Sequence, residues 1–205
     1  SWSLRGWLLF DAFGIPVKTQ TGRLYTDELP QLLTRFEPAR TVPAMRCPDG
    51  TVVPDSLAMA EELASRHPDA GFLPSDPGGR AVARVLIAEM HAGFTALRSH
   101  CPMNIEASLP DVGQQVLGAQ EAVRDDLARI DAMWSEALSA SGGPFLFGGF
   151  GIADAYYAPV VARLRTYALP DRLLTVSHSA VWNRALETLD KFIIMDDVTL
   201  DDASA

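Results

Sequence analysis

The chain of 205 residues has a formal net charge of −9, which argues against a nucleic-acid-binding protein because such surfaces are typically basic. Hydrophobic residues make up 48% of it, enough for a globular core, and we find no apolar run of membrane-spanning length. Cys47 and Cys101 stand far apart and match no metal-binding spacing, and the four histidines are scattered. We therefore expect two reduced thiols in a cytoplasmic protein, with no metal site and no membrane partner.

The first part of the chain predicts alternating helices and strands. Apolar residues recur at helical spacing up to the Gly14-Ile15-Pro16 stop signal, so we expect a first helix there. A short strand at 17–20 and a loose helix at 26–36 follow. Residues 42–47 and 51–53 then predict a hairpin around an Asp-Gly turn, and 55–67 predict a helix that opens on Asp55.

The second part predicts helices alone. Residues 68–79 are rich in proline and glycine and indicate a linker. We expect long helices within 78–100 and 110–140, an apolar helix at 152–169, a shorter one at 179–192, and a loosely held acidic tail at 196–205. We find no strand beyond the linker.

Three stretches taken together resemble the cytosolic glutathione transferases. They are Thr-Val-Pro-Ala-Met at 41–45, the hairpin and helix start at 49–63, and Phe-Gly-Ile-Ala-Asp at the start of 150–164. The resemblance implies a thioredoxin-like α/β domain at 1–67, a linker at 68–79 and an all-helical domain at 80–205. The opening Ser-Trp-Ser-Leu-Arg is most similar to the serine-type zeta (maleylacetoacetate isomerase-like) class, although Trp2 stands where that class has cysteine.

The resemblance also implies how glutathione, the co-substrate, would be held. Val42, before a cis Pro43, would pair its main-chain N–H and C=O with the cysteinyl part of the tripeptide. Asp55 and Ser56 would hold the α-amine and α-carboxylate of the γ-glutamyl group at a helix N-terminus, which favours anions. Helix capping by Asp55 and Ser56 is the alternative, and the two roles are compatible.

The same resemblance places a thiol-activating hydroxyl at the start of the first helix. A free thiol has a pKa near 8.5, and a hydroxyl donating to sulfur together with a helix N-terminus lowers it. Ser1 is the first candidate and Ser3 the second; the alternative for both is simple capping. Arg5 receives no catalytic role. Asp154 is interpreted as structural, one half of a capping box whose other half is lost because Gly151 stands at the N-cap.

The electrophilic substrate would bind between the two domains. His91, Phe94 and Arg98 recur at i, i+3 and i+7, which would place them on one helical face. Tyr157, with Met103 and Asn104, would line the same pocket. A core face carrying one surface arginine is an equally good interpretation of this pattern.

We therefore expect a glutathione transferase that attacks a small electrophile or isomerises it through a glutathione adduct, and that forms a homodimer. A non-catalytic binding protein of the same fold is the alternative, and glutathione-dependent reduction is disfavoured because no cysteine lies near the first helix. In this family a central strand precedes the first helix. Its absence here would leave a gap in the sheet, so we expect about ten further residues upstream of Ser1.

Overall fold

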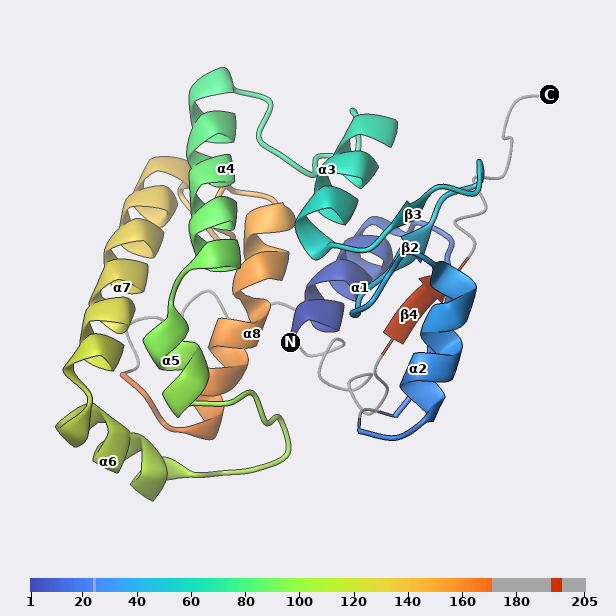
Figure 1. Cartoon of the computed structure of the whole chain (residues 1–205). Helices are drawn as coiled ribbons and strands as arrows, with labels where there is room; N and C mark the ends of the chain where they lie inside the picture. The colour runs from blue at the N-terminus through green and yellow to red at the C-terminus, as the bar shows by residue number, and fades with distance from the viewer. Residues whose placement is uncertain (24, 171–192, 197–205) are drawn as a thin grey trace. The chain divides into compact units, whose positions relative to one another are not determined.

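The computed structural model describes residues 1–23, 25–170 and 193–196 (Figure 1). The chain divides into two compact units. Unit 1 contains Ser1–Ala70 together with Glu187–Ala205, and unit 2 contains Gly71–Leu186. The division between residues 70 and 71 falls inside the stretch expected to be a linker, and the first helix of unit 2 already begins at Pro77.

Unit 1 is built on a four-stranded sheet with the order β1-β4-β2-β3. The strands are β1 (Lys18–Thr21), β2 (Met45–Arg46), β3 (Val52–Val53) and β4 (Ile193–Asp196). β4 is central: it pairs antiparallel with β1, from Lys18↔Asp196 to Thr21↔Ile193, and parallel with β2 at Met45↔Met195. β2 and β3 form the predicted hairpin, which is antiparallel.

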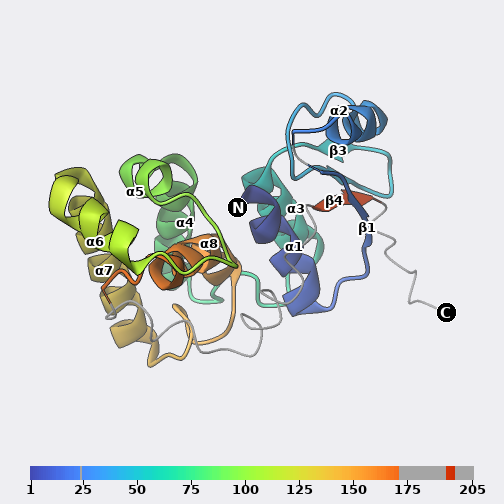
Figure 2. The same cartoon turned by 90° about the horizontal axis from the view of Figure 1, so that it is seen from below.

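Helices cover both faces of this sheet. The helices α1 (Trp2–Phe13) and α3 (Ser56–Arg66) pack against each other, whereas α2 (Glu28–Leu33) and the 3₁₀ turn η1 (Thr34–Phe36) lie on the other side (Figure 2). α1 ends as its sequence predicts, because Gly14 adopts φ 61° and closes the helix with a hydrogen bond to Asp11. Beneath α2, Phe36 and Ala44 form a small apolar cluster.

β4 corrects two of our predictions for the sheet. We expected no strand after the linker, and we expected the central position to stay open unless residues upstream of Ser1 fill it, but residues 193–196 occupy a central position and complete the backbone pairing. Sequence pattern could not find this strand, because four residues are too few to show a period and the partners lie 150 to 178 positions earlier in the chain. The prediction of residues upstream of Ser1 is a separate matter and stays a prediction.

Helices are the main elements of the described part of unit 2 (Figure 1). Its helices are α4 (Pro77–Ala92), α5 (Thr95–His100), α6 (Pro110–Ala119), α7 (Glu121–Ser141) and α8 (Ile152–Thr166). α8 forms the core, since every one of its residues except Arg165 is buried. α8 packs against α4, and α7 packs against α5 and α6.

Two of the long predicted helices are each divided in two. The first breaks between α4 and α5, where Gly93 is extended and Phe94 adopts a left-handed φ of 53°. The second breaks at Gln120, which ends α6 and begins α7. A lone glycine inside a helical pattern is a weak stop signal, so the first break was not predicted. The helix predicted at 179–192 and the tail after Asp196 lie outside the described residues.

Candidate functional site

The start of α1 carries the first predicted functional group. Ser1 occupies the N-cap position, yet its side chain makes no capping hydrogen bond to the described helix α1. The first turn of α1 contains no acidic residue, so no carboxylate of its own offsets the positive end of the helix dipole. The simple capping interpretation of Ser1 is thus not supported by the geometry, and the helix start suits an anionic ligand.

The residues after Ser1 turn inward. Ser3 is 8% exposed and Arg5 is 1% exposed. The guanidinium carbon of Arg5 lies 4.5 Å from the centre of the Trp2 ring, within the range of a cation–π contact. Arg5 is therefore a structural charge inside unit 1. Of the two candidate hydroxyls, that of Ser1 is more accessible than that of Ser3, because Ser1 is only half-buried.

The second group is the main chain of Val42. The Val42–Pro43 peptide bond is cis, which confirms the prediction made from the family resemblance. The main-chain N–H and C=O of Val42 make no hydrogen bond with any residue that the structure describes. Val42 is half-buried and lies just before β2, so both groups are available to an extended peptide-like ligand.

The third group stands at the start of α3. Asp55 is the N-cap residue, and its Oδ1 accepts hydrogen bonds from the N–H groups of Leu57 at 2.7 Å and Ala58 at 3.0 Å. Capping by Asp55 is thereby confirmed, whereas its predicted contact with a ligand stays a prediction. Ser56, the first residue of α3, is only 1% exposed. Figure 1 shows the starts of α1 and α3 at the same end of unit 1.

In unit 2 the predicted substrate-binding residues do not share one helical face. His91 lies on α4, Phe94 is the N-cap residue of α5, and Arg98 lies on α5 beyond the break. The predicted i, i+3, i+7 alignment is wrong because the helix is interrupted between them. Arg98 donates from Nη1 to the carbonyl oxygen of Gly93 at 3.2 Å, across that break. Both His91 and Arg98 are half-buried.

Tyr157 and Phe94 lie in the apolar interior of unit 2. Tyr157 is 1% exposed, and its hydroxyl donates to the carbonyl oxygen of Leu86 at 3.2 Å. Its ring packs edge-on against Trp134, with centroids 5.2 Å apart, and lies 6.4 Å from the ring of Phe94. Neither side chain is open to a ligand in unit 2 taken by itself, and their substrate-binding role stays a prediction.

Sequence reasoning missed the buried arginine that fixes the segment after α5. Arg163 on α8 donates from Nε to the carbonyl oxygen of Cys101 and from Nη1 to that of Pro159, both at 2.8 Å. Burial lowers the pKa of Arg163 to about 10, with a further contribution from Arg98. Thr166 and Tyr167 add bonds to the carbonyls of Asn104 and Pro102. The sequence signal that could have revealed this buried arginine is its place within an otherwise apolar helix.

Asp154 has the structural role that was predicted for it. It is 7% exposed and accepts hydrogen bonds from the N–H groups of Gly151 at 2.9 Å and Leu146 at 3.1 Å. Only one half of the capping box exists, because glycine has no side chain to return the bond. The bond to Leu146, which no sequence pattern predicted, also ties the preceding turn to α8.

Cys47 and Cys101 are buried free thiols, and burial raises the pKa of each. Over residues 1–23, 25–170 and 193–196, no group of three or more metal-binding side chains comes together. In the same residues, no helix combines the length and the apolarity that a membrane crossing requires.

Two family models match the chain, one in each half. Residues 1–66 match the glutathione S-transferase N-terminal domain, and residues 118–183 match the glutathione S-transferase C-terminal domain. The chain belongs to the glutathione S-transferase family. The two domains occur in the order that the sequence resemblance implied, and the thioredoxin-like and helical units of the structure correspond to them.

Curated relatives of this glutathione S-transferase include isomerases. It is 28% identical over 175 residues to maleylacetoacetate isomerase of Rattus norvegicus, an alignment that covers 83% of this chain and 73% of the rat protein. It is 33% identical over 99 residues to a probable maleylacetoacetate isomerase of Caenorhabditis elegans, covering 48% of this chain and 45% of that protein.

Solved structures share the fold. A maleylacetoacetate isomerase from Anaeromyxobacter dehalogenans, crystallised with glutathione in its active site, is 24% identical with a TM-score of 0.53, covering 90% of each chain. Glutathione transferase Omega 3C from Trametes versicolor is 21% identical with a TM-score of 0.58, covering 92% of this chain and 80% of that one. At these identities the likeness establishes the two-domain fold of this glutathione S-transferase.

Proposed function

We propose that this chain is a glutathione transferase that converts bound glutathione to its thiolate. The thiolate attacks a small electrophilic molecule, or isomerises it through a transient glutathione adduct. The observation that carries the proposal is the match of both halves of the chain to glutathione S-transferase domains. The names of the relatives, maleylacetoacetate isomerases, favour the isomerisation branch.

Ser1 is proposed as the group that activates the thiol. Its hydroxyl stands at the N-cap of α1 and makes no capping hydrogen bond to that helix, a position from which it would donate to a sulfur bound at the helix start. The helix dipole adds to the same effect. Each unit by which the thiol pKa falls below 8.5 stabilises the thiolate by about 1.4 kcal/mol. Ser3 is the reserve, disfavoured by its burial.

Val42 and the start of α3 are proposed to hold the rest of glutathione. The main-chain groups of Val42, which bond to no described residue, suit the cysteinyl peptide unit. Asp55 keeps its capping bonds through Oδ1 and can attract the γ-glutamyl ammonium by its charge. The N-terminal N–H groups of α3, with Ser56, suit the γ-glutamyl carboxylate.

The electrophile is proposed to meet His91 and Arg98. Both are half-buried and polar, and Arg98 would attract an anionic substrate group. Phe94 and Tyr157 are proposed to support this region from behind through their ring contact. We further propose a cytoplasmic homodimer, in which two copies of the chain each carry a complete pair of domains.

The experiment compares the chain with Ser1→Ala, Ser1→Thr and Ser3→Ala variants. Retention on immobilised glutathione reports binding, and ultraviolet absorbance of the bound thiolate against pH reports its pKa. We expect Ser1→Ala to bind glutathione but to raise the thiol pKa towards 8.5, with about a tenfold loss of rate at neutral pH for each unit. Ser1→Thr keeps the hydroxyl and should restore most of the effect.

Turnover assays distinguish a catalytic glutathione transferase from a non-catalytic binding protein. The panel consists of a chloronitroaromatic compound and a cis-unsaturated dicarbonyl acid, the second testing isomerisation. Glutathione binding without turnover of either class would favour the alternative, a non-catalytic ligand-binding protein. Trp2 in place of the zeta-class cysteine is an argument against the isomerisation branch. An unchanged thiol pKa in Ser1→Ala would remove Ser1 from the mechanism.

A further inference from the structure

The carboxylate of Asp126 on α7 reaches across to the neighbouring helix α5, and both helices belong to unit 2. Its Oδ2 accepts the main-chain N–H of Leu97 at 2.9 Å. Leu97 is the third residue of α5 and is 0% exposed, so its N–H has neither a partner in the helix nor access to water. Asp126 therefore supplies, from outside the helix, the capping bond that the start of α5 needs.

α5 has no means of capping itself. Its N-cap residue is Phe94, whose side chain has no hydrogen-bond acceptor, and its first turn contains no acidic residue. Phe94 also adopts a left-handed φ of 53°, which is unfavourable for a residue with a bulky side chain. A helix of six residues is too short to be stable through its own hydrogen bonds. The position of α5 thus depends on contacts within unit 2, of which the Asp126 bond is one.

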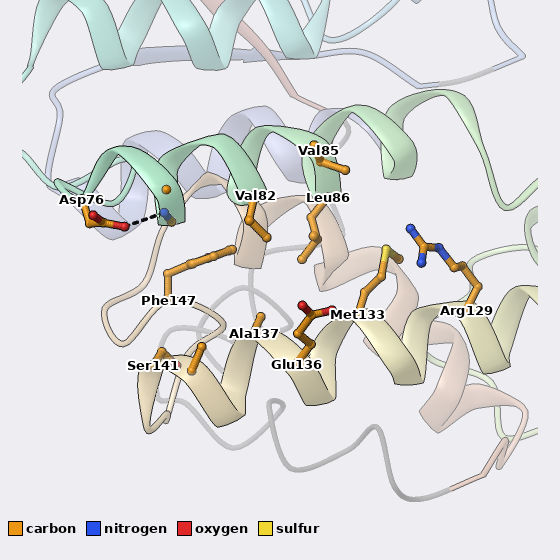
Figure 3. A pocket seen from close by; sticks show the side chains of 13 residues that line it. Asp76, Val82, Val85, Leu86, Arg129, Met133, Glu136, Ala137, Ser141 and Phe147 are labelled. Carbon is orange, nitrogen blue, oxygen red and sulfur yellow. Dashed lines mark hydrogen bonds between the residues drawn. The ribbon is translucent and has the colours of Figure 1, made fainter.

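Asp126 differs in direction from other charged side chains of α7. Asp125, its neighbour in the chain, is exposed, whereas Asp126 is half-buried. Arg129 turns to α4, where it donates to the two carboxylate oxygens of Glu89 at 2.7 Å and 2.8 Å. Glu136 points into the middle of the cavity between α4 and α7 (Figure 3). Of these four side chains of α7, Asp126 is the one placed to hold α5.

The residue that α5 places next is Arg98. It follows Leu97 directly, and its Nη1 donates to the carbonyl oxygen of Gly93 at 3.2 Å, back across the break between α4 and α5. Gly93 is itself fixed, because its N–H donates to the carbonyl oxygen of Glu89 at 2.7 Å. The backbone of Arg98 is thus located by the first turn of α5, and its guanidinium by Gly93. Loosening of that turn would let the guanidinium leave its position.

We propose that Asp126 is a positioning residue for the electrophile. By capping α5 it holds Arg98 where the guanidinium meets an anionic group of the ligand, and Asp126 itself does not touch the ligand. This inference rests on the proposed function, in which Arg98 attracts that anionic group. A guanidinium binds a carboxylate through charge-assisted hydrogen bonds of defined geometry. Loss of its position should therefore weaken the binding of anionic ligands and leave the binding of neutral ones unchanged.

The experiment measures the binding of dinitrobenzoate and of dinitrobenzene to the full chain by equilibrium dialysis. The two probes differ by one carboxylate, and neither requires turnover. We expect Arg98→Gln and Asp126→Ala each to weaken dinitrobenzoate binding about fivefold and to leave dinitrobenzene binding unchanged. Removing a negative charge from α7 would by itself strengthen the binding of an anion. The expected weakening thus has the opposite sign to a direct charge effect.

Three further variants test whether Asp126 acts through Arg98. Asp126→Asn keeps an oxygen that can accept the N–H of Leu97, so it should restore most of the binding. Asp125→Ala removes the same charge from the exposed neighbouring position and is the matched control, expected to bind dinitrobenzoate as the unchanged chain does. The double variant of Arg98→Gln with Asp126→Ala should bind no more weakly than Arg98→Gln alone.

Two results would overturn the inference, and they can be told apart. If the losses in the double variant add, Asp126 acts on the fold rather than on Arg98, and the proposed role of Arg98 stands. If the unchanged chain shows no preference for dinitrobenzoate that Arg98→Gln removes, the proposed role of Arg98 fails, and the positioning role of Asp126 fails with it.

Discussion

The buried carboxylate of Asp154 accepts the main-chain N–H of Leu146 at 3.1 Å, eight residues before it in the chain. Its other oxygen accepts the N–H of Gly151 at 2.9 Å. One side chain thus fixes both the first turn of α8 and the hairpin-like turn that precedes it. Because α8 is the core of unit 2, the energetics of Asp154 affect the whole unit.

The stability of unit 2 should depend on pH through Asp154. Burial raises the pKa of Asp154 from 3.8 to about 6. A shift of this size corresponds to a contribution of about 3 kcal/mol to the free energy of unfolding. Since the raised pKa means that the folded state holds its proton more tightly, this contribution is complete below pH 3.8. It is lost as the pH rises through about 6. Urea unfolding of the chain between pH 4 and 7 measures it.

Asp154→Asn is the reference for that measurement, because asparagine does not titrate. It should be less stable by about 1–3 kcal/mol at low pH, since its amide can accept only one of the two N–H groups. The difference between the two proteins should shrink as the pH rises from 4 to 6. Carboxylates with lowered pKa values, such as Glu89, are common to both proteins and cancel. A difference independent of pH would contradict the prediction.

Gly151→Ser should fail to stabilise the chain, although it completes the capping box. A Cβ at Gly151 would lie 3.0 Å from the carbonyl oxygen of Phe72, which already accepts the N–H of Ile152. This crowding should offset the gain of a fraction of a kcal/mol from the serine hydroxyl. The free energy of unfolding, compared with Gly151→Ala, tests it. A clear gain for serine would show that the Phe72 carbonyl moves aside.

Gly113→Ala should strongly destabilise unit 2. Its Cβ would lie 1.8 Å from the main-chain oxygen of Tyr167, so α6 could not remain against the end of α8. We expect a loss of about 2–3 kcal/mol, as for severe overpacking. Gly118 is in the same helix with nothing near its Cβ position, and Gly118→Ala should instead gain about 0.5–1 kcal/mol. Thermal unfolding of both variants tests the contrast, and similar midpoints would refute it.

Met195→Pro should disrupt the sheet of unit 1. Met195 is opposite Thr19 on one side and Met45 on the other, so proline removes a backbone donor from a central strand. Met195→Ala keeps the donor and is the control. We expect a lower unfolding midpoint and faster hydrogen exchange in β1 and β2 for the proline variant. Equal stability of the two variants would show that β4 is dispensable.

Much of the candidate glutathione site could be predicted from local sequence. The cis bond before Pro43 was expected from the family resemblance and the Asp55 cap from its place before a helix, and both were found where expected. The N-cap position of Ser1 is different, because a serine before a helix normally caps it. Only the geometry of its hydroxyl shows that the capping bond is not made.

The substrate-binding residues show where local reasoning fails. His91, Phe94 and Arg98 have helical spacing, and spacing alone places them on one face. The helix ends at Ala92 because Gly93 is extended and Phe94 takes a left-handed conformation. Those backbone angles depend on packing elsewhere, including the ring contact between Phe94 and Tyr157.

The sequence by itself determined the two-part organisation, the hairpin, the Asp55 cap and the family, because each depends on residue types at short and fixed spacings. The tertiary structure decided which segment fills the centre of the sheet, why Gly151 stands at a cap, and where unit 2 leaves a cavity. These features arise from contacts between residues distant in the chain, such as Gly151 with Phe72 and β4 with β2. No local pattern encodes such contacts, since backbone pairing and close packing depend on what the rest of the fold brings near.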